Sequence, residues 1–273
     1  MLITMDHNQT DLTCAYCGNP GEITREHIWP RCIIERVPSY NTRYSKSADK
    51  VFGAELVIRD VCVKCNNGVL SKLDSYICDL FDRYFHRHPQ PNTTVRFEYS
   101  FDLLLRWLLK ISYNSARTTD PNTPLRIFRE YILGTAPYPS ESVSLALDIV
   151  PPVEFITRGD GIKRTLTPDW MRCGEAQLVP SASSWCIIRF VTLNAFHFLV
   201  LVTPVNTVKV DESEIRRVLS SIPGHPVYPN RTHIDAPVGK PSISRMHMHH
   251  FEAKKDLYDA HSSRSKGRKK PLK

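Results

Sequence analysis

Apolar and polar positions in the first 91 residues follow three patterns that predict secondary structure. Short apolar-rich stretches at 22–28 and 55–61 predict two strands, with a polar loop over 31–53 between them. From position 69 to position 84 apolar residues recur at spacings of three and four, which is typical of an amphipathic helix. Pro89 and Pro91 follow it, and proline cannot continue a helix. This region therefore predicts the order strand, long loop, strand, helix.

The rest of the chain predicts helices followed by a sheet. A strand at 94–99 precedes a helix with apolar residues on one face at positions 103, 104, 107, 108 and 111. A turn-rich break at 118–124 comes before a second helix through Ile127 and Tyr131. Beyond Gly134 short apolar runs predict strands at 143–150, 153–157, 185–192, 195–202 and 207–210. Leu193 and Asn194 separate two of these runs and predict a hairpin, and Asp211 is placed to cap a helix over 211–221.

These patterns predict an α+β protein whose sheet is mostly antiparallel. We expect a small strand–strand–helix module over residues 1–91 and an α+β domain of unknown role over residues 92–261. Residues 262–273 are expected to form a basic flexible tail. The chain has no internal repeat at a fixed period.

Composition is that of a globular protein, with 41% hydrophobic and 23% charged residues. No apolar run is long enough to span a bilayer, and the longest, at 185–202, is interrupted by polar residues. The first residues lack the basic and apolar regions of a signal peptide. A cytoplasmic location without membrane contact is the expectation. In that reducing compartment, close pairs of cysteines favour metal binding over disulfides.

The net charge of +8 is concentrated at the C-terminus. Residues 1–78 hold nine basic and nine acidic residues, whereas residues 262–273 hold six basic residues and no acid. A tail of this kind suits contact with nucleic-acid phosphates without reading sequence. A solubilising terminus that binds nothing is the equal alternative.

Two C-x2-C pairs, Cys14 with Cys17 and Cys62 with Cys65, predict a zinc site. Each pair supplies two thiolates one turn apart, and four thiolates saturate a tetrahedral zinc ion, so this zinc is expected to be structural. The 44 residues between the pairs require a folded segment to bring them together. Buried free cysteines or a redox pair are the alternative. The remaining cysteines are interpreted as small buried apolar residues: Cys32, Cys78, Cys173 and Cys186.

Glu26, His27 and Asn66 are candidates for phosphodiester hydrolysis. A histidine has a pKa suited to deprotonating an attacking water. A carboxylate and an amide oxygen are hard ligands for Mg²⁺ or Mn²⁺. Neighbouring strand residues point to opposite faces, so Glu26 and His27 can share a site only where the strand bends, and Pro30 is placed to allow this. The helix expected to begin near Asn66 directs its N-terminal dipole to the same place and favours phosphate.

The order of three motifs, C-x2-C-G at 14–18, E-H-x-x-P at 26–30 and V-C-x-x-C-N-N at 61–67, resembles the HNH endonuclease family. The resemblance covers residues 14 to about 85. It implies a ββα-metal fold with four-cysteine zinc. It also implies His27 as the general base and Glu26 and Asn66 as the metal ligands. Two positions depart from the family pattern: Glu26 replaces the usual Asp, and the middle Asn is absent, with Asp60 as the candidate substitute.

The function that follows from this resemblance is a metal-dependent endonuclease that cleaves DNA. HNH modules fused to other domains also suggest an effector of bacterial antiphage defence, with residues 92–261 binding a protein partner or trigger. One alternative is a non-catalytic zinc module that binds nucleic acid or a protein, and another is an RNase using the same site. Each residue has an ordinary alternative role: Asn66 as a helix cap, Glu26 as a surface carboxylate beside Arg25, and His27 as a structural histidine.

Overall fold

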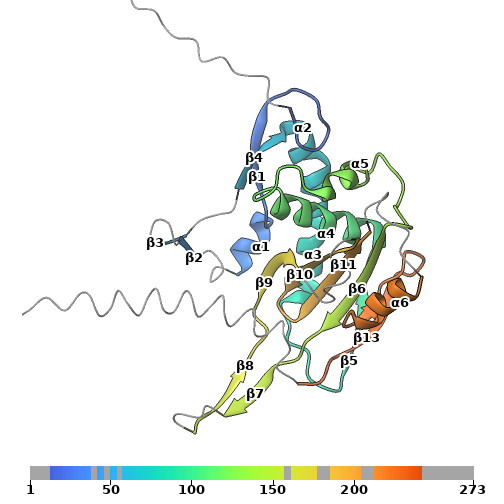
Figure 1. Ribbon diagram of the computed structural model, residues 1–273. Coiled ribbons are helices and arrows are strands. Elements are labelled where there is room, and N and C mark those ends of the chain that lie inside the picture. The colour runs from blue at the N-terminus through green and yellow to red at the C-terminus, as the bar shows by residue number, and fades with distance from the viewer. Residues whose placement is uncertain are drawn as a thin grey trace, which may run out of the picture.

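The computed structural model describes residues 13–37, 42–45, 50–53, 57–156, 161–176, 185–203 and 212–241 (Figure 1). The predicted strand at 207–210, the helix cap at Asp211 and the basic tail at 262–273 lie outside the described residues. The α+β class with mostly antiparallel sheets is confirmed.

A five-stranded antiparallel sheet forms the centre of the molecule, in the order β12-β6-β11-β10-β9. Its strands are β6 (Val143–Ile149), β9 (Met171–Glu175), β10 (Ile187–Leu193), β11 (Phe196–Val202) and β12 (His225–Pro226). The hairpin between β10 and β11 turns at Asn194, which has a φ of 52°. Asparagine tolerates this left-handed conformation better than most residues, which explains why it occupies the turn.

Both faces of the sheet are covered, so the central strand β11 is buried along its whole length. Phe196, Phe198 and Val200 belong to the main core on the side of α4 (Phe101–Ala116). Leu199 and Leu201 point the other way and form a smaller core with Val218 of α6 (Glu212–Ser221). Because successive side chains of a strand point to opposite faces, β11 contributes apolar side chains to the core on each side of the sheet.

The N-terminal region forms a two-stranded hairpin followed by a long helical stretch (Figure 1). Strand β1 (Ile23–His27) pairs antiparallel with β4 (Val57–Cys62). The helical stretch over residues 63–85 comprises α2 (Val63–Cys65), a π-helical turn (Asn66–Leu70), α3 (Ser71–Leu80) and a second π-helical turn (Phe81–Phe85). The helix therefore begins at Val63, three residues before the predicted start at Asn66.

The segment predicted as a polar loop, residues 31–53, contains secondary structure instead. It forms α1 (Arg31–Arg36) and a small hairpin of β2 (Thr42–Ser45) and β3 (Lys50–Gly53). Helix α1 begins directly after Pro30, whose carbonyl accepts from the amides of Ile33 and Ile34. The prediction failed because α1 has only 6 residues, too few for its buried Ile33 and Ile34 to produce a periodic pattern.

The last described strand pairs with the first strand of the second region, which begins at residue 92. Strand β13 (His233–Pro237) pairs antiparallel with β5 (Thr94–Glu98), although the sequence between them exceeds 130 residues. Phe97 of β5 contacts Phe85, Phe196 and Phe198 in an aromatic cluster. Strand β13 was not predicted, and the pairing with β5 explains why so polar a segment is a strand.

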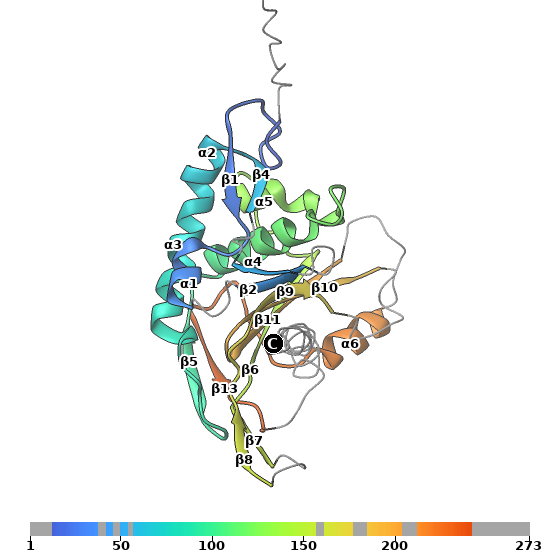
Figure 2. The same cartoon turned by 90° about the vertical axis from the view of Figure 1, so that its left-hand side faces the viewer.

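The remaining elements lie at the edges of the fold. A 3-10 turn (Pro124–Phe128) leads into α5 (Arg129–Leu133), which ends at Gly134 with a left-handed φ of 74°. Strands β7 (Val153–Ile156) and β8 (Lys163–Leu166) form a hairpin that extends away from the body in both views (Figures 1 and 2).

One continuous hydrophobic core joins the two regions that the sequence divided at residue 91. Its buried members run from Cys14 to Val238. Trp29, just after β1, contacts Trp107 of α4 with ring centroids 6.2 Å apart. Helix α4 therefore packs on the N-terminal module as well as on the sheet.

Cys32 and Cys78 were interpreted as small buried apolar residues. Cys78 is buried, but Cys32 is only partly buried, and the two are bonded to each other. They form a disulfide that joins α1 to α3, with a Cα–Cα distance of 6.4 Å. Arg36 and Asp82 make a two-bond ion pair between the same part of the chain and the turn after α3. Cys186 is buried, and Cys173 packs against the main core.

Candidate metal centre and its surroundings

The four predicted cysteines meet in one cluster, as the spacing of the two pairs indicated. The sulfur atoms of Cys14, Cys17, Cys62 and Cys65 all lie within 4.8 Å of one another. The Cys17 and Cys62 sulfurs are 3.9 Å apart. In a tetrahedral zinc site with Zn–S bonds of about 2.3 Å, neighbouring sulfurs are about 3.8 Å apart. The cluster therefore fits a four-thiolate zinc ion that has no open coordination position.

Backbone contacts of the β1–β4 hairpin bring the two cysteine pairs together. Pairing places Ile23 opposite Cys62, and the Ala15 amide donates to the Asp60 carbonyl at 2.7 Å. The loop of the first pair closes with the Gly18 amide donating to the Cys14 carbonyl, and Gly18 takes a left-handed φ of 72°. A glycine allows this turn without strain. The folded hairpin thus replaces the short linker of a compact zinc ribbon.

Electrostatics of the cluster favour a bound cation. Burial acts to raise the pKa of the Cys14 thiol, but backbone hydrogen bonds, including those from the Cys62 and Tyr16 amides at 3.4 Å, lower it to about 7. Burial and the neighbouring sulfurs raise the pKa of Cys65. Several thiolates this close repel one another, and a divalent ion removes that repulsion.

Asn66 contacts the strand that ends in His27. Its Nδ2 atom donates to Thr24 Oγ1 at 2.8 Å and to the Arg25 carbonyl at 3.1 Å. Asn66 lies inside the helical stretch and Cys62 is the capping residue, so the alternative role of Asn66 as a helix cap is wrong. His27 is half-buried at the end of β1, opposite Val57. Asn66 therefore holds the helix against β1 within three residues of His27.

Glu26 points away from this contact and into the protein. The residue is 2% exposed, and its Oε1 atom lies 2.7 Å from Lys110 Nζ and accepts from Asn114 Nδ2 at 3.1 Å. An irregularity in the β1–β4 pairing between Thr24 and Glu26 accompanies this orientation. The alternative of a surface carboxylate beside Arg25 is therefore wrong. A hydrated Mg²⁺ ion does not fit this carboxylate while the ammonium group holds it.

The partners of Glu26 belong to a polar stripe along α4 and the residue that follows it, at positions 107, 110, 114 and 117. Asn114 Oδ1 accepts from the Tyr16 hydroxyl at 2.5 Å and from Arg117. Arg117 also donates to both carboxylate oxygens of Asp60 at 3.0 Å. Asp60, considered as a substitute for the missing Asn, thus fixes β4 to α4. This stripe connects both strands and the loop of the first cysteine pair to α4.

Asp74 supplies the second carboxylate that binds the Lys110 ammonium group, a role that was not predicted from the sequence. Both of its oxygens lie 2.7 Å from Lys110 Nζ, and Oδ1 accepts from Trp107 Nε1 at 3.1 Å. Asp74 is therefore bound by two side chains of α4 and is not a solvated helix residue. One signal was present: Lys110 interrupts the apolar run of a helix that is otherwise built for burial.

The buried Tyr16 and Lys110 predict a loss of stability at alkaline pH. Burial raises the pKa of the Tyr16 hydroxyl above its ordinary value of 10.0. Burial acts to lower the pKa of Lys110, but Asp74 and Glu26 outweigh it and raise that pKa above 10.5. Both groups hold their protons more firmly in the folded state than in the unfolded state. Their contribution to the free energy of unfolding is therefore complete below about pH 10 and is lost as the pH rises above it.

The test is urea unfolding between about pH 9 and about pH 11. Each proton that the folded state retains lowers the free energy of unfolding by up to about 1.4 kcal/mol per pH unit. Tyr16→Phe should have a shallower decline than wild type. An equally steep decline in both proteins would show that Tyr16 does not titrate differently on folding.

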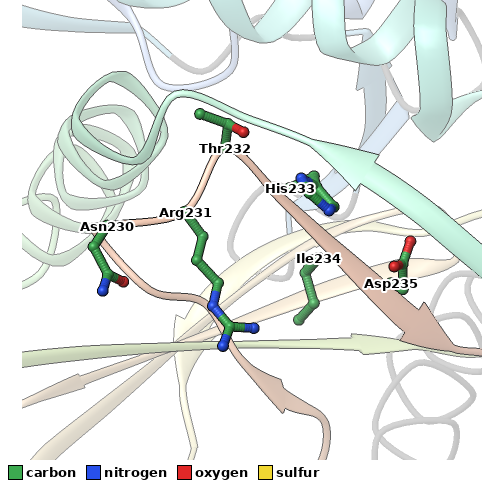
Figure 3. A pocket seen from close by; sticks show the side chains of 6 residues that line it. All are labelled: Asn230, Arg231, Thr232, His233, Ile234 and Asp235. Carbon is green, nitrogen blue, oxygen red and sulfur yellow. The ribbon is translucent and has the colours of Figure 1, made fainter.

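A separate groove of about 560 Å³ runs along β13 (Figure 3). Within the part of the chain that the structure describes, residues 230–235 line it. Arg231 lies over the ring of Tyr228 at 5.3 Å and shares the groove with His233 and Asp235. The groove carries both signs of charge, and no predicted site residue lines it.

The chain matches no protein-family model, no curated protein and no solved structure. No helix in the described ranges is long and apolar enough to cross a membrane.

Proposed function

We propose that this protein is a metal-dependent endonuclease of the HNH type that hydrolyses phosphodiester bonds in DNA. The observation that supports this most is the contact of Asn66 with Thr24 and Arg25, which holds the first turns of the helix beside the strand that ends in His27. The four-cysteine cluster secures the hairpin at the other end of β1 and β4. This arrangement of the two strands and the helix supports the proposal.

His27 is proposed to accept the proton of the attacking water, which suits a side chain whose ordinary pKa is near neutrality. A divalent cation such as Mg²⁺ or Mn²⁺ supplies charge stabilisation when bound. We propose the side-chain oxygen of Asn66, Oδ1, as a ligand of this cation, because the two contacts that Asn66 makes with β1 use its Nδ2 atom. The earlier prediction that Glu26 is a second ligand requires the contact between Glu26 and Lys110 to open.

Exposed arginines on the hairpin support DNA as the substrate. Arg25 and Arg59 are exposed on β1 and β4. Exposed arginines can contact backbone phosphates, and such contacts position DNA without reading its sequence. The six basic residues of the tail, outside the described residues, add the same kind of contact.

A protein partner is proposed to bind the second region, as expected for an effector of antiphage defence. The β7–β8 hairpin, which extends from the body (Figure 1), supports this because one of its residues, Ile156, is 68% exposed. Ile162, the residue before β8, is also exposed, so the hairpin presents two apolar residues, and exposed apolar patches mark interaction sites.

The test of the nuclease is cleavage of supercoiled plasmid DNA with Mg²⁺ or Mn²⁺. His27→Ala should reduce the rate at least about 100-fold, the usual effect of removing a general base, while zinc content and fold are retained. His233→Ala on β13 is the matched control and should cleave at the wild-type rate. Nicking that survives His27→Ala would exclude the proposed mechanism. A single-stranded RNA substrate in parallel distinguishes an RNase.

The burial of Glu26 favours a second candidate, the non-catalytic zinc module that binds nucleic acid or a protein. A carboxylate that is 2% exposed and bound by Lys110 and Asn114 is a structural group as it stands. This candidate predicts that wild type and His27→Ala shift DNA equally in a gel and that neither cleaves it with any divalent ion.

A further inference from the structure

The ammonium group of Lys110 occupies an unusual place for a lysine. It is 0% exposed, on a helix between the N-terminal module and the sheet. Its Nζ atom lies 2.7 Å from Glu26 of β1 and 2.7 Å from both oxygens of Asp74 of α3. A buried lysine is retained only when charges or hydrogen bonds compensate it, and here two carboxylates from separate elements do so.

The carboxylates of this cluster have further donors besides the ammonium group. Asn114 donates to Glu26 Oε1, and Trp107 Nε1 donates to Asp74 Oδ1. All three donors come from α4. The two carboxylates raise the pKa of Lys110, so the ammonium form is present at neutral pH. The cluster is therefore a buried arrangement of opposite charges with its hydrogen bonds made.

The position beside Glu26 does not meet the requirements of a divalent cation. Mg²⁺ binds a carboxylate oxygen at about 2.1 Å and keeps several waters. Glu26 is 2% exposed, and the Lys110 ammonium and the Asn114 amide occupy the space at its Oε1 atom that such an ion and its waters would need. A cation on its Oε1 atom would also lie close to the Lys110 ammonium, and two positive charges repel strongly in a buried site.

We infer that the Lys110 ammonium group is the permanent counter-ion of Glu26 and Asp74. It occupies the place where the resemblance to HNH endonucleases implies a divalent ion on Glu26. Divalent ions therefore bind this chain without Glu26 as a ligand. Lys110 is then a positioning residue: it holds β1 and α3 together through charge, as a metal ion does in a metal-bound site. Glu26 keeps the strand in place beside His27 and does not ligate the ion.

This inference concerns the ligand set of the proposed nuclease, but its readout is metal binding and not cleavage. The zinc-loaded full chain is titrated with Mn²⁺, and free Mn²⁺ is followed by its electron paramagnetic resonance signal. Glu26→Gln should leave the Mn²⁺ affinity of the chain within about twofold of that of wild type. A tenfold or larger loss of affinity in Glu26→Gln would overturn the inference, because Glu26 would then be a ligand.

A second variant tests whether the ammonium takes the cation's place. Lys110→Met leaves Glu26 and Asp74 facing each other without a counter-charge, so Mn²⁺ should bind there and raise the melting temperature. Lys64→Met, which removes an exposed lysine of α2, is the matched control and should show no such rise. The rise should disappear in Lys110→Met with Glu26→Gln. A Lys110→Met protein that neither binds nor is stabilised by Mn²⁺ would contradict the inference.

The two proposals fail separately. Absence of cleavage by wild type, with Mn²⁺ binding unaffected by Glu26→Gln, rejects the nuclease and leaves the role of Lys110 intact. Cleavage that depends on His27, with Mn²⁺ affinity lost in Glu26→Gln, rejects the role of Lys110 and leaves the nuclease intact.

Discussion

Replacing Cys62 with serine is expected to release zinc and unfold most of the protein. Removing one of four thiolates leaves an incomplete tetrahedral site, and apparent zinc binding to such sites is about 10–16 kcal/mol in small zinc-binding peptides. That exceeds or equals the whole stability of a typical domain, about 5–15 kcal/mol. Because Cys14, Cys62 and Cys65 belong to the same core as α4, the loss should extend beyond the hairpin.

The measurements are zinc content after dialysis and the far-ultraviolet circular dichroism melt. Cys173→Ser is the matched control: it alters a cysteine of the sheet, far along the chain from the cluster, and should keep one zinc ion per chain. A chelator should reproduce the effect of Cys62→Ser, and added zinc should reverse it. A Cys62→Ser protein with full zinc content and an unchanged melt would show that the cluster is not a metal site.

Lys110→Met is expected to lower the free energy of unfolding by about 3–5 kcal/mol, as measured when one partner of a buried ion pair is removed. Methionine fills much of the volume of the lysine stem, so the cost comes mainly from Glu26 and Asp74, which lose their counter-charge. Urea unfolding at neutral pH without divalent ions measures it. Lys72→Met, an exposed change on α3, should stay within about 0.5 kcal/mol of wild type.

A triple variant distinguishes the effect of the lost charge from the effect of altered packing. Combining Lys110→Met with Glu26→Gln and Asp74→Asn removes all three charges with little change of shape. Replacing a complete buried ion pair in this way is often nearly neutral, so this variant should recover most of the lost stability. If it is as unstable as Lys110→Met alone, the lysine stem matters through packing, and the charge argument is wrong.

Helix α4 changes how the candidate site is understood. The motifs that indicated the site end at Asn67, yet Lys110, Asn114 and Arg117 contact Glu26, Tyr16 and Asp60. The N-terminal module is thus completed by a helix of the second region. Changes to the polar stripe on α4 are therefore changes to the surroundings of His27, although no motif includes them.

Several features could be predicted from the sequence because their cause is local. The strands of the central hairpin, β10 and β11, are apolar runs separated by a residue that accepts a left-handed turn, and periodicity alone identifies α4. The spacing within each cysteine pair predicts two thiolates on one turn. Features made by distant pairing could not be predicted: β13 is polar and short, and only its ladder with β5 makes it a strand.

The sequence by itself determined the α+β class, the two cysteine pairs and the residues of the motif, because helix periodicity, strand alternation and metal-ligand spacing act over a few neighbouring residues. Only the tertiary structure decided that the pairs meet, that Cys32 bonds with Cys78, and that Glu26 faces Lys110. The physical reason is that a charge in the core takes whichever opposite charge the packing brings near it, and the packing of α4 against β1 and α3 depends on the whole core.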